Sequence, residues 1–128
     1  IQSGLIKSAH DCSEGGLAVA VAECAISQNI ARETPRLIGA ALDLSEIADI
    51  RLDALLFGET QGRIIVTTSA DDAVKVIERA KIMGVSAMKL GVVGGNDLKI
   101  KTATGEFTWP LAELHDGWWN SIARAMQA

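Results

Sequence analysis

Residues 8–23, SAHDCSEGGLAVAVAE, pass from a polar turn to an apolar helix within a few positions. Residues 5–9 are predicted to be extended, and the two glycines after Glu14 open a helix that reaches about Gln28. Ser13 is predicted to cap this helix, because a serine oxygen can accept from backbone N–H groups left free in the first turn. The helix body is apolar on almost every face, which predicts a sheet on one side and another element on the other.

The rest of the chain continues the alternation of strands and helices. Strands are predicted over residues 37–44, 62–68, 86–93, 98–102 and 106–108, with short helical turns over 46–56. A helix over 70–83, capped by Ser69, is predicted to bury an apolar stripe, and one last helix follows Pro110. This order predicts an α/β (α+β) sandwich, in which helices pack on a mixed, largely antiparallel sheet.

Length and composition indicate one globular domain over residues 1–128. The chain is 48% apolar and 22% charged, and a length of 128 residues is enough to bury a core. Its net charge of −4 is spread among mixed signs, so no basic stripe favours nucleic acid. The longest apolar stretch, residues 17–26, is far shorter than the roughly 20 residues of a membrane span. Membranes and nucleic acids are therefore not expected partners.

Two further features concern the setting of the chain. Cys12 and Cys24 form neither a CxxC spacing nor a Cys/His cluster, which indicates a reduced, cytoplasmic protein. Ile1 stands in what reads as the middle of an element, so we expect the C-terminal fragment of a longer multidomain protein.

The first candidate site is the turn before the apolar helix, with His10, Asp11, Ser13, Gly15 and Gly16 as its candidate residues. Glycines at a helix start allow close backbone approach, and the free N–H groups there favour phosphate or carboxylate. Asp11 has the hard oxygens that Mg²⁺ prefers, and His10 can donate to a phosphate or sugar oxygen. The alternative is a capped helix whose glycines only permit tight packing.

The second candidate site is residues 56–63, LFGETQGR, immediately before the strongest strand signal. Glu59, Gln61 and Arg63 alternate, so an extended backbone projects them to one side. Such a polar set suits a ligand with hydroxyl, amide and phosphate groups. The alternative is a solvated turn with Glu59 and Arg63 paired on the surface, a contact of about 0–1 kcal/mol.

Three further positions have simpler interpretations. His115 is predicted to be a packed or surface histidine, not a base. Trp118 and Trp119 are predicted to supply one core ring and one ring for a neighbouring domain. Glu23, alone in an apolar helix, needs an arginine partner or contact with another domain.

Taken together, three runs resemble one family. Residues 8–23 and 56–66, in this order, are similar to the C-terminal half of the aminoimidazole ribonucleotide synthetase superfamily. Residues 111–126, LAELHDGWWNSIARAM, also resemble the end of its phosphoribosylformylglycinamidine synthase branch, in the small form of that enzyme. The resemblance therefore extends over nearly the whole chain, and the fold it implies is that of the C-terminal domain of aminoimidazole ribonucleotide synthetase.

This resemblance implies part of a carbon–nitrogen ligase of purine biosynthesis. Such an enzyme uses ATP and Mg²⁺ to amidate formylglycinamide ribonucleotide, with glutamine as the amido donor. The implied partners are the enzyme's own N-terminal domains, a glutaminase subunit and a small accessory subunit. The fragment is expected to be inactive alone and to bind no cofactor, while the alternatives are a domain of a related small-molecule kinase and a purely structural interface module.

The resemblance also bears on individual residues. The turn containing Glu59 and Gln61 matches the one by which the first C-terminal domain of such enzymes grips the ribonucleotide, whereas this chain looks like the second copy. Residues 10–16 then border an auxiliary nucleotide site or a domain interface. No residue matches the family's proton acceptor or its main Mg²⁺ ligands, so we assign no catalytic or metal-binding residue. Whether this copy binds nucleotide, substrate or neither stays open.

Overall fold

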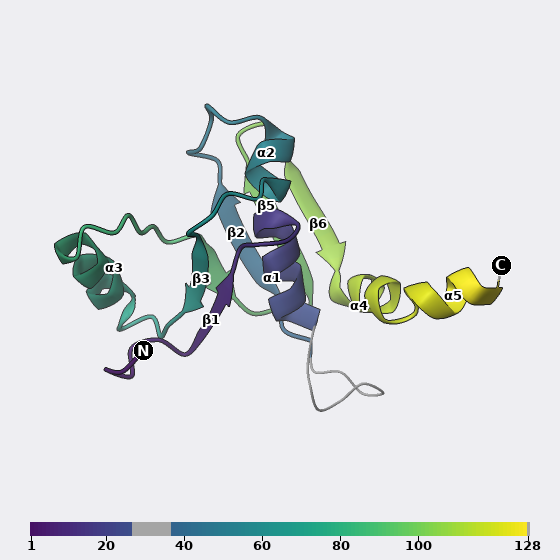
Figure 1. Ribbon diagram of the computed structural model, residues 1–128, viewed down its shortest axis with the longest axis horizontal. Coiled ribbons are helices and arrows are strands. Elements are labelled where there is room, and N and C mark those ends of the chain that lie inside the picture. Colours follow the sequence, from purple (N-terminus) through teal and green to yellow (C-terminus); the bar gives the residue numbers. More distant parts are fainter. Residues whose placement is uncertain (27–36, 128) are drawn as a thin grey trace.

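The computed structural model describes residues 1–26 and 37–127. Strands and helices alternate along the chain, as Figure 1 shows. Their bounds are β1 (Ser8–Asp11), α1 (Gly16–Ile26), β2 (Ala40–Leu44), α2 (Leu52–Phe57), β3 (Ile64–Thr67), α3 (Ala73–Ile82), β4 (Gly91–Val93), β5 (Asp97–Thr102), β6 (Glu106–Pro110), α4 (Leu111–Trp119) and α5 (Ser121–Gln127). None of the helices in these described ranges has the length and apolar content that crossing a membrane requires.

The strands form two sheets. Four of them make a mixed sheet in the order β4-β2-β5-β6, in which only the central β2–β5 pair is parallel. β1 and β3 form a separate antiparallel ribbon, with Ala9 opposite Val66. The predicted fold class, a mixed and largely antiparallel sheet with helices packed on it, is confirmed. The separation of the β1–β3 ribbon from the larger sheet was not predicted.

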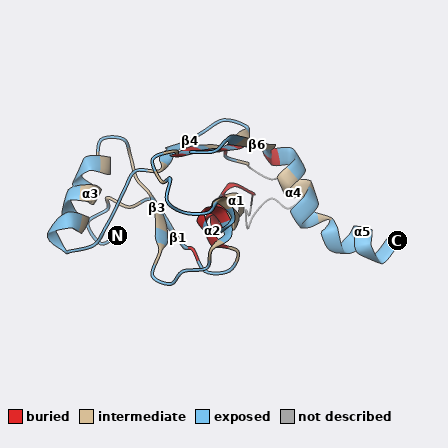
Figure 2. Cartoon of the chain, turned by 90° about the horizontal axis from the view of Figure 1, so that it is seen from above, coloured by how far each residue is buried: buried red, intermediate tan, exposed pale blue. Residues whose placement is uncertain are grey.

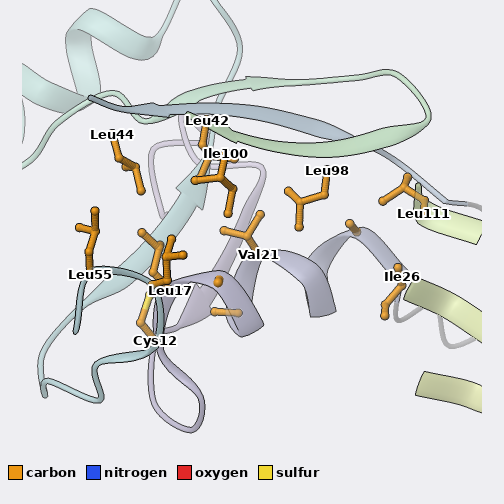
Figure 3. Close-up of a cluster of buried hydrophobic side chains, with 14 residues drawn as sticks. Cys12, Leu17, Val21, Ile26, Leu42, Leu44, Leu55, Leu98, Ile100 and Leu111 are labelled. Atoms are coloured by element: carbon orange, nitrogen blue, oxygen red, sulfur yellow. The ribbon is translucent and has the colours of Figure 1, made fainter. Parts of the chain in front are cut away.

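The core lies between the inner face of the four-stranded sheet and α1. Along β5, Leu98, Ile100 and Thr102 are buried while Lys99 and Lys101 are exposed, as the two-residue repeat of a strand requires. Figure 3 shows side chains of α1 and of the sheet pointing toward one another in this space. Burying each large aliphatic side chain stabilises the fold by about 1.5–3 kcal/mol, so this layer holds most of the stability.

Helix α1 is covered on more than one side, as its uniformly apolar sequence predicted. Beyond the sheet it packs against α2, which contributes the buried Leu55 and Leu56, and against α4, which contributes Leu111. It also contacts β1 of the ribbon. The expected second cover is thus provided by this chain itself. α1 is described up to Ile26, and the predicted helical position Gln28 lies outside the described residues.

Helix α3 differs from the prediction. The predicted buried stripe is wrong, because α3 contains no buried residue and Ile82 is 86% exposed. Figure 2 shows α3 on one side of the molecule, away from the layer that contains α1 and the sheet. The Ser69 cap is also wrong: its hydroxyl bonds to the carboxylate of Asp72 at 2.9 Å, and the helix begins only at Ala73. Periodicity predicted the helix correctly, but not what would cover it.

A strand and the last helix also differ from the prediction. The strand expected over 86–93 forms only at Gly91–Val93, the three residues that are in register with β2. The single last helix is divided at Asn120, where the backbone turns to φ −97° and ψ 2°. The amide of Asn120 still donates to the Asp116 carbonyl at 3.0 Å, so α5 continues from α4 with little interruption.

Candidate functional site

The two motifs predicted from the sequence lie side by side. Pairing of β1 with β3 sets Asp11 opposite Ile64, and the amide of Cys12 donates to the Arg63 carbonyl at 3.0 Å. The loop that follows β1 therefore runs beside the loop that precedes β3. This pairing, which no local pattern specifies, brings residues about 50 positions apart into one site.

A hydrogen bond between the motifs caps α1. The amide of Gly15 donates to Glu59 Oε1 at 2.8 Å, and a carboxylate beside the first turn of a helix also interacts favourably with the helix dipole. The predicted Ser13 cap is wrong, because the Ser13 hydroxyl donates to the Asp11 carboxylate instead. That bond lowers the pKa of Asp11 by stabilising its charged form. The cap thus comes from a distant loop, which capping rules based on adjacent residues could not identify.

A depression of about 340 Å³ opens where the loops meet. It is lined by Cys12, Ser13, Glu14, Glu59, Thr60, Gln61, Gly62 and Arg63. Four of these were predicted candidates, namely Ser13, Glu59, Gln61 and Arg63. The sequence analysis missed the other four, although each adjoins a predicted residue. These four residues could have been identified from their neighbours in the sequence, because a depression formed by two loops is lined by consecutive residues of each loop.

Arg63 closes the second loop on itself. Its Nη2 donates to the carbonyl of Gly58, and its Nε is buried without a hydrogen-bond partner among the described residues. The alternative interpretation of this turn was a surface pair between Glu59 and Arg63. In the structure both side chains have other partners, since Glu59 accepts from the Gly15 amide and Arg63 donates to Gly58. The Arg63 guanidinium is therefore held against the backbone of its own loop at Gly58, and the Glu59 carboxylate is held against the start of α1.

The glycines have structural reasons as well. Gly16 has φ +74°, and a Cβ at this position would lie 2.6 Å from the backbone carbonyl carbon of Phe57. The start of α1 can therefore pass the end of α2 only without a side chain. For Gly16 the geometry supports the alternative of tight packing, while Gly15 presents its amide to Glu59.

His10 and Asp11 are not among the lining residues of the depression. His10 Nδ1 lies 2.6 Å from the Asp11 carbonyl oxygen, and its Nε2 lies 3.3 Å from Glu23 Oε2. Glu23 thus has a histidine beside it, and neither expected partner, an arginine or another domain, is required. Within residues 1–26 and 37–127, no group of three His, Cys, Asp or Glu side chains could hold a metal ion. The Mg²⁺ interpretation of Asp11 gains no geometric support.

The chemistry available in the depression is recognition by hydrogen bonding. Burial raises the pKa of the Cys12 thiol, which disfavours the nucleophilic thiolate. The lining contains two carboxylates, of Glu14 and Glu59, and one guanidinium, of Arg63, so its formal charge is −1. Neutral hydroxyl and amide groups suit this lining better than a bare phosphate, which would need further positive charge.

Aromatic residues gather at the other end of the molecule. His115 stacks on Trp119 with ring centroids 6.4 Å apart, in agreement with a packed or surface histidine. Trp118 and Trp119 are 47% and 44% exposed, so the expectation that one would be a core ring is wrong. Trp109 on β6 is the tryptophan that packs against the core. Trp109 reaches the core because β6 belongs to the sheet, whereas Trp118 and Trp119 lie on α4, which extends beyond the end of the sheet (Figure 1).

Comparison with protein families then identifies the domain. Residues 1–102 match the family described as "AIR synthase related protein, C-terminal domain". The chain belongs to this family. The resemblance noted from residues 8–23 and 56–66 is thereby confirmed, because both runs lie inside the matched region.

Two relatives of this AIR synthase-related domain carry the same name. The chain is 37% identical over 129 residues to "Phosphoribosylformylglycinamidine synthase subunit PurL" of Anaeromyxobacter dehalogenans (strain 2CP-C), covering 99% of this chain and 16% of the relative. The protein of the same name from Chelativorans sp. (strain BNC1) is 38% identical over 92% of this chain and 15% of its own length. The chain thus spans about a sixth of the relatives it matches.

A solved structure supports the fold. "T. maritima PurL complexed with ATP" superimposes with a TM-score of 0.69 and 22% identity, covering 89% of this chain and 19% of that one. At this level of identity the likeness concerns the fold alone. It confirms that the sheet and helices of this AIR synthase-related domain are arranged as in a segment of that larger protein.

Proposed function

We propose that this chain is the C-terminal domain of a PurL-type subunit of phosphoribosylformylglycinamidine synthase. The subunit would take part in the ATP-dependent amidation of formylglycinamide ribonucleotide in purine biosynthesis, in the cytoplasm, with glutamine as the ultimate amido donor. The family match and the 37% identity to PurL over 99% of the chain support this proposal. The proposed unit is one domain over residues 1–128.

In this proposal the domain contributes binding surface and no reacting group. The N-terminal domains of the same enzyme would supply most of the ATP and Mg²⁺ ligands, and a glutaminase subunit and a small accessory subunit would complete the complex. The isolated domain would then show no turnover and hold no cofactor. The single Arg63 among two carboxylates, and the raised pKa of Cys12, accord with a site that does no chemistry of its own.

The observation that carries the site proposal is the hydrogen bond from Gly15 to Glu59, which joins the two motifs around one depression. Ser13, Glu59, Gln61 and Arg63 would form the binding face. Gly15 and Gly16 would set the start of α1 beside this face, and His10 and Asp11 would shape the loop behind it. Gln61 and Thr60 are exposed at this face and carry amide and hydroxyl groups. A ribose or amide portion of a ribonucleotide is the ligand portion that this lining would fit best.

A second candidate is a structural interface module that has lost ligand binding. It is favoured by the fact that Glu59 already accepts a hydrogen bond from Gly15, which is a structural role for the carboxylate. The two candidates differ at Gln61, because the binding site needs its amide and the structural module does not.

The test is ammonia- and ATP-dependent turnover of formylglycinamide ribonucleotide by the longer protein that contains this domain. Gln61→Ala is compared with Gln2→Ala, a change of the same kind at an exposed position that does not line the depression. Loss of one hydrogen bond, about 0.5–1.5 kcal/mol, should raise KM for the ribonucleotide or nucleotide roughly 2- to 10-fold in the Gln61 variant alone.

Each other result has a definite meaning. Absence of turnover by the folded wild-type protein with its partner subunits would reject the enzymatic assignment. Equal KM values in both variants, with turnover intact, would favour the structural module over the binding site.

A further inference from the structure

The last 17 described residues form an arm that leaves the core. We define the arm as α4 and α5, residues 111–127. Leu111 is 1% exposed and Leu114 packs against the core from the same face of α4, but α5 contains no buried residue. Figures 1 and 2 both show the arm extending from the end of β6 away from the sheet. The arm is thus anchored at one end only.

One face of the arm is apolar and exposed. Trp118, Ile122 and Met126 are spaced four apart, which places them on one side of a helix. Their exposed fractions are 47%, 73% and 82%, so exposure rises with distance from the core. We call these three residues the apolar stripe. Large apolar side chains in such a row on an ordered helix are typical of a surface that another protein segment covers.

The opposite face of the arm is polar and paired within itself. Asn120 Nδ2 donates to Asp116 Oδ1 at 2.7 Å, and the Arg124 guanidinium donates to the other oxygen of Asp116. These bonds join α5 to α4 across Asn120, so the arm is held together without contact to the core. They also pair the charges of Asp116 and Arg124 with each other, so neither charge is directed at the apolar stripe.

The comparisons separate the arm from the common family domain. The family match ends at residue 102, before the arm begins, whereas the PurL relative from Anaeromyxobacter dehalogenans is matched over 99% of the chain. That relative is long, since this chain corresponds to only 16% of it. The arm therefore lies outside the segment that matches the family, but inside the segment that matches this long relative.

We propose that the apolar stripe docks into an uncharged, apolar groove on another domain of the same longer polypeptide. This inference rests on the proposed function only in that the domain belongs to a PurL-type chain. An uncharged groove is the complement of a stripe whose nearby charges are already paired. A second copy, whose stripe would pair with this one about a two-fold axis, is the competing occupant that the experiment separates. Another domain is favoured because this chain corresponds to only 16% of the relative's length, so most of that polypeptide lies outside it.

The experiment measures amide hydrogen exchange of α5 in the longer protein, which does not depend on catalysis. Ile122→Asp places a charge in the apolar stripe, and Gln127→Asp places the same charge on α5 outside it; both positions are exposed in this domain. Docking predicts that α5 amides exchange at least 10-fold faster in the Ile122 variant than in wild type. The Gln127 variant should exchange at the wild-type rate.

Two results would overturn the inference. Exchange that is equally fast in wild type and both variants would mean that nothing covers the stripe. Protection of α5 in the 128-residue chain that grows with its concentration would identify a second copy as the occupant. A longer protein without ribonucleotide turnover, but with the expected exchange pattern, would reject the proposed enzymatic function and leave the docking intact.

Discussion

Helices α1 and α3 have similar lengths, 11 and 10 residues, but opposite relations to the rest of the molecule. α1 is uniformly apolar and lies among the sheet, α2 and α4, with most of its residues buried. α3 is amphipathic and buries none. The difference teaches that local sequence predicts where a helix forms, whereas the burial of that helix depends on which surfaces the topology brings against it. α3 and α5 are the two helices of residues 1–26 and 37–127 that contain no buried residue.

The largest expected effect comes from the core side of this comparison. Ile100→Ala removes a fully buried side chain, 0% exposed, and should lower the free energy of unfolding by about 2–5 kcal/mol. Ile82→Ala removes the same atoms from α3, where the side chain is 86% exposed, and should change it by less than about 0.5 kcal/mol. Urea unfolding of the two variants measures both values. Similar losses would show that α3 is as well packed as α1.

The next effect concerns the contact between α1 and α2. Gly16→Ala should cost about 1–2 kcal/mol for the left-handed backbone and about 1–3 kcal/mol more for the clash with Phe57. Gly62→Ala, at φ +77° with open space around it, should cost only the first of these. The same unfolding measurement tests the pair. Equal costs would mean that α2 moves aside, and that the close approach at Gly16 does not constrain the core.

The smallest effect is a pH dependence confined to the arm. The hydrogen bond from Asn120, followed by that from Arg124, lowers the pKa of Asp116 below its ordinary value of 3.8. A carboxyl with a lowered pKa in the folded state stabilises that state above the unfolded pKa, and this contribution is lost as the pH falls through the folded value. Lower protection of the α5 amides, relative to their intrinsic exchange rate at each pH, is therefore expected below about pH 4.

Asp116→Asn is the control for this pH dependence, since it removes the titrating group and keeps a polar side chain of the same shape. Protection of the α5 amides in this variant, relative to their intrinsic exchange rate, should be lower at neutral pH and should not fall further on acidification. An unchanged acid response in the variant would assign the effect to other carboxyls, such as Asp72 near α3, whose pKa is also lowered by hydrogen bonds.

Much of the fold could be predicted from local patterns. The order of strands and helices is as predicted, because alternation and helical periodicity report which face of each element is apolar. The caps predicted at Ser13 and Ser69 are wrong, because each hydroxyl bonds to the carboxylate of a nearby aspartate and not to the amides of its helix. Local capping rules do not report this competing partner. The division of the last helix at Asn120 gave no periodic signal, since apolar residues recur at helical spacing on both sides of it.

The candidate site divides in the same way. Residue types at positions 10–16 and 56–63 indicated polar loops with glycine-dependent backbone, and half of the depression's lining was named from them. His10 and Asp11 were expected in the same site, but the direction of β1 turns His10 toward Glu23 on α1. Side-chain direction in a strand alternates, so a shift of one residue decides which surface a side chain joins.

The sequence alone determined the family, the fold class and the two loops that could bind a ligand, because these depend on residue types at short spacings. Tertiary structure decided that the loops meet, since only the β1–β3 pairing brings Gly15 to Glu59. It also decided that α3 and the end of the arm stay exposed, because burial depends on the surfaces that surround a helix and not on the pattern within it.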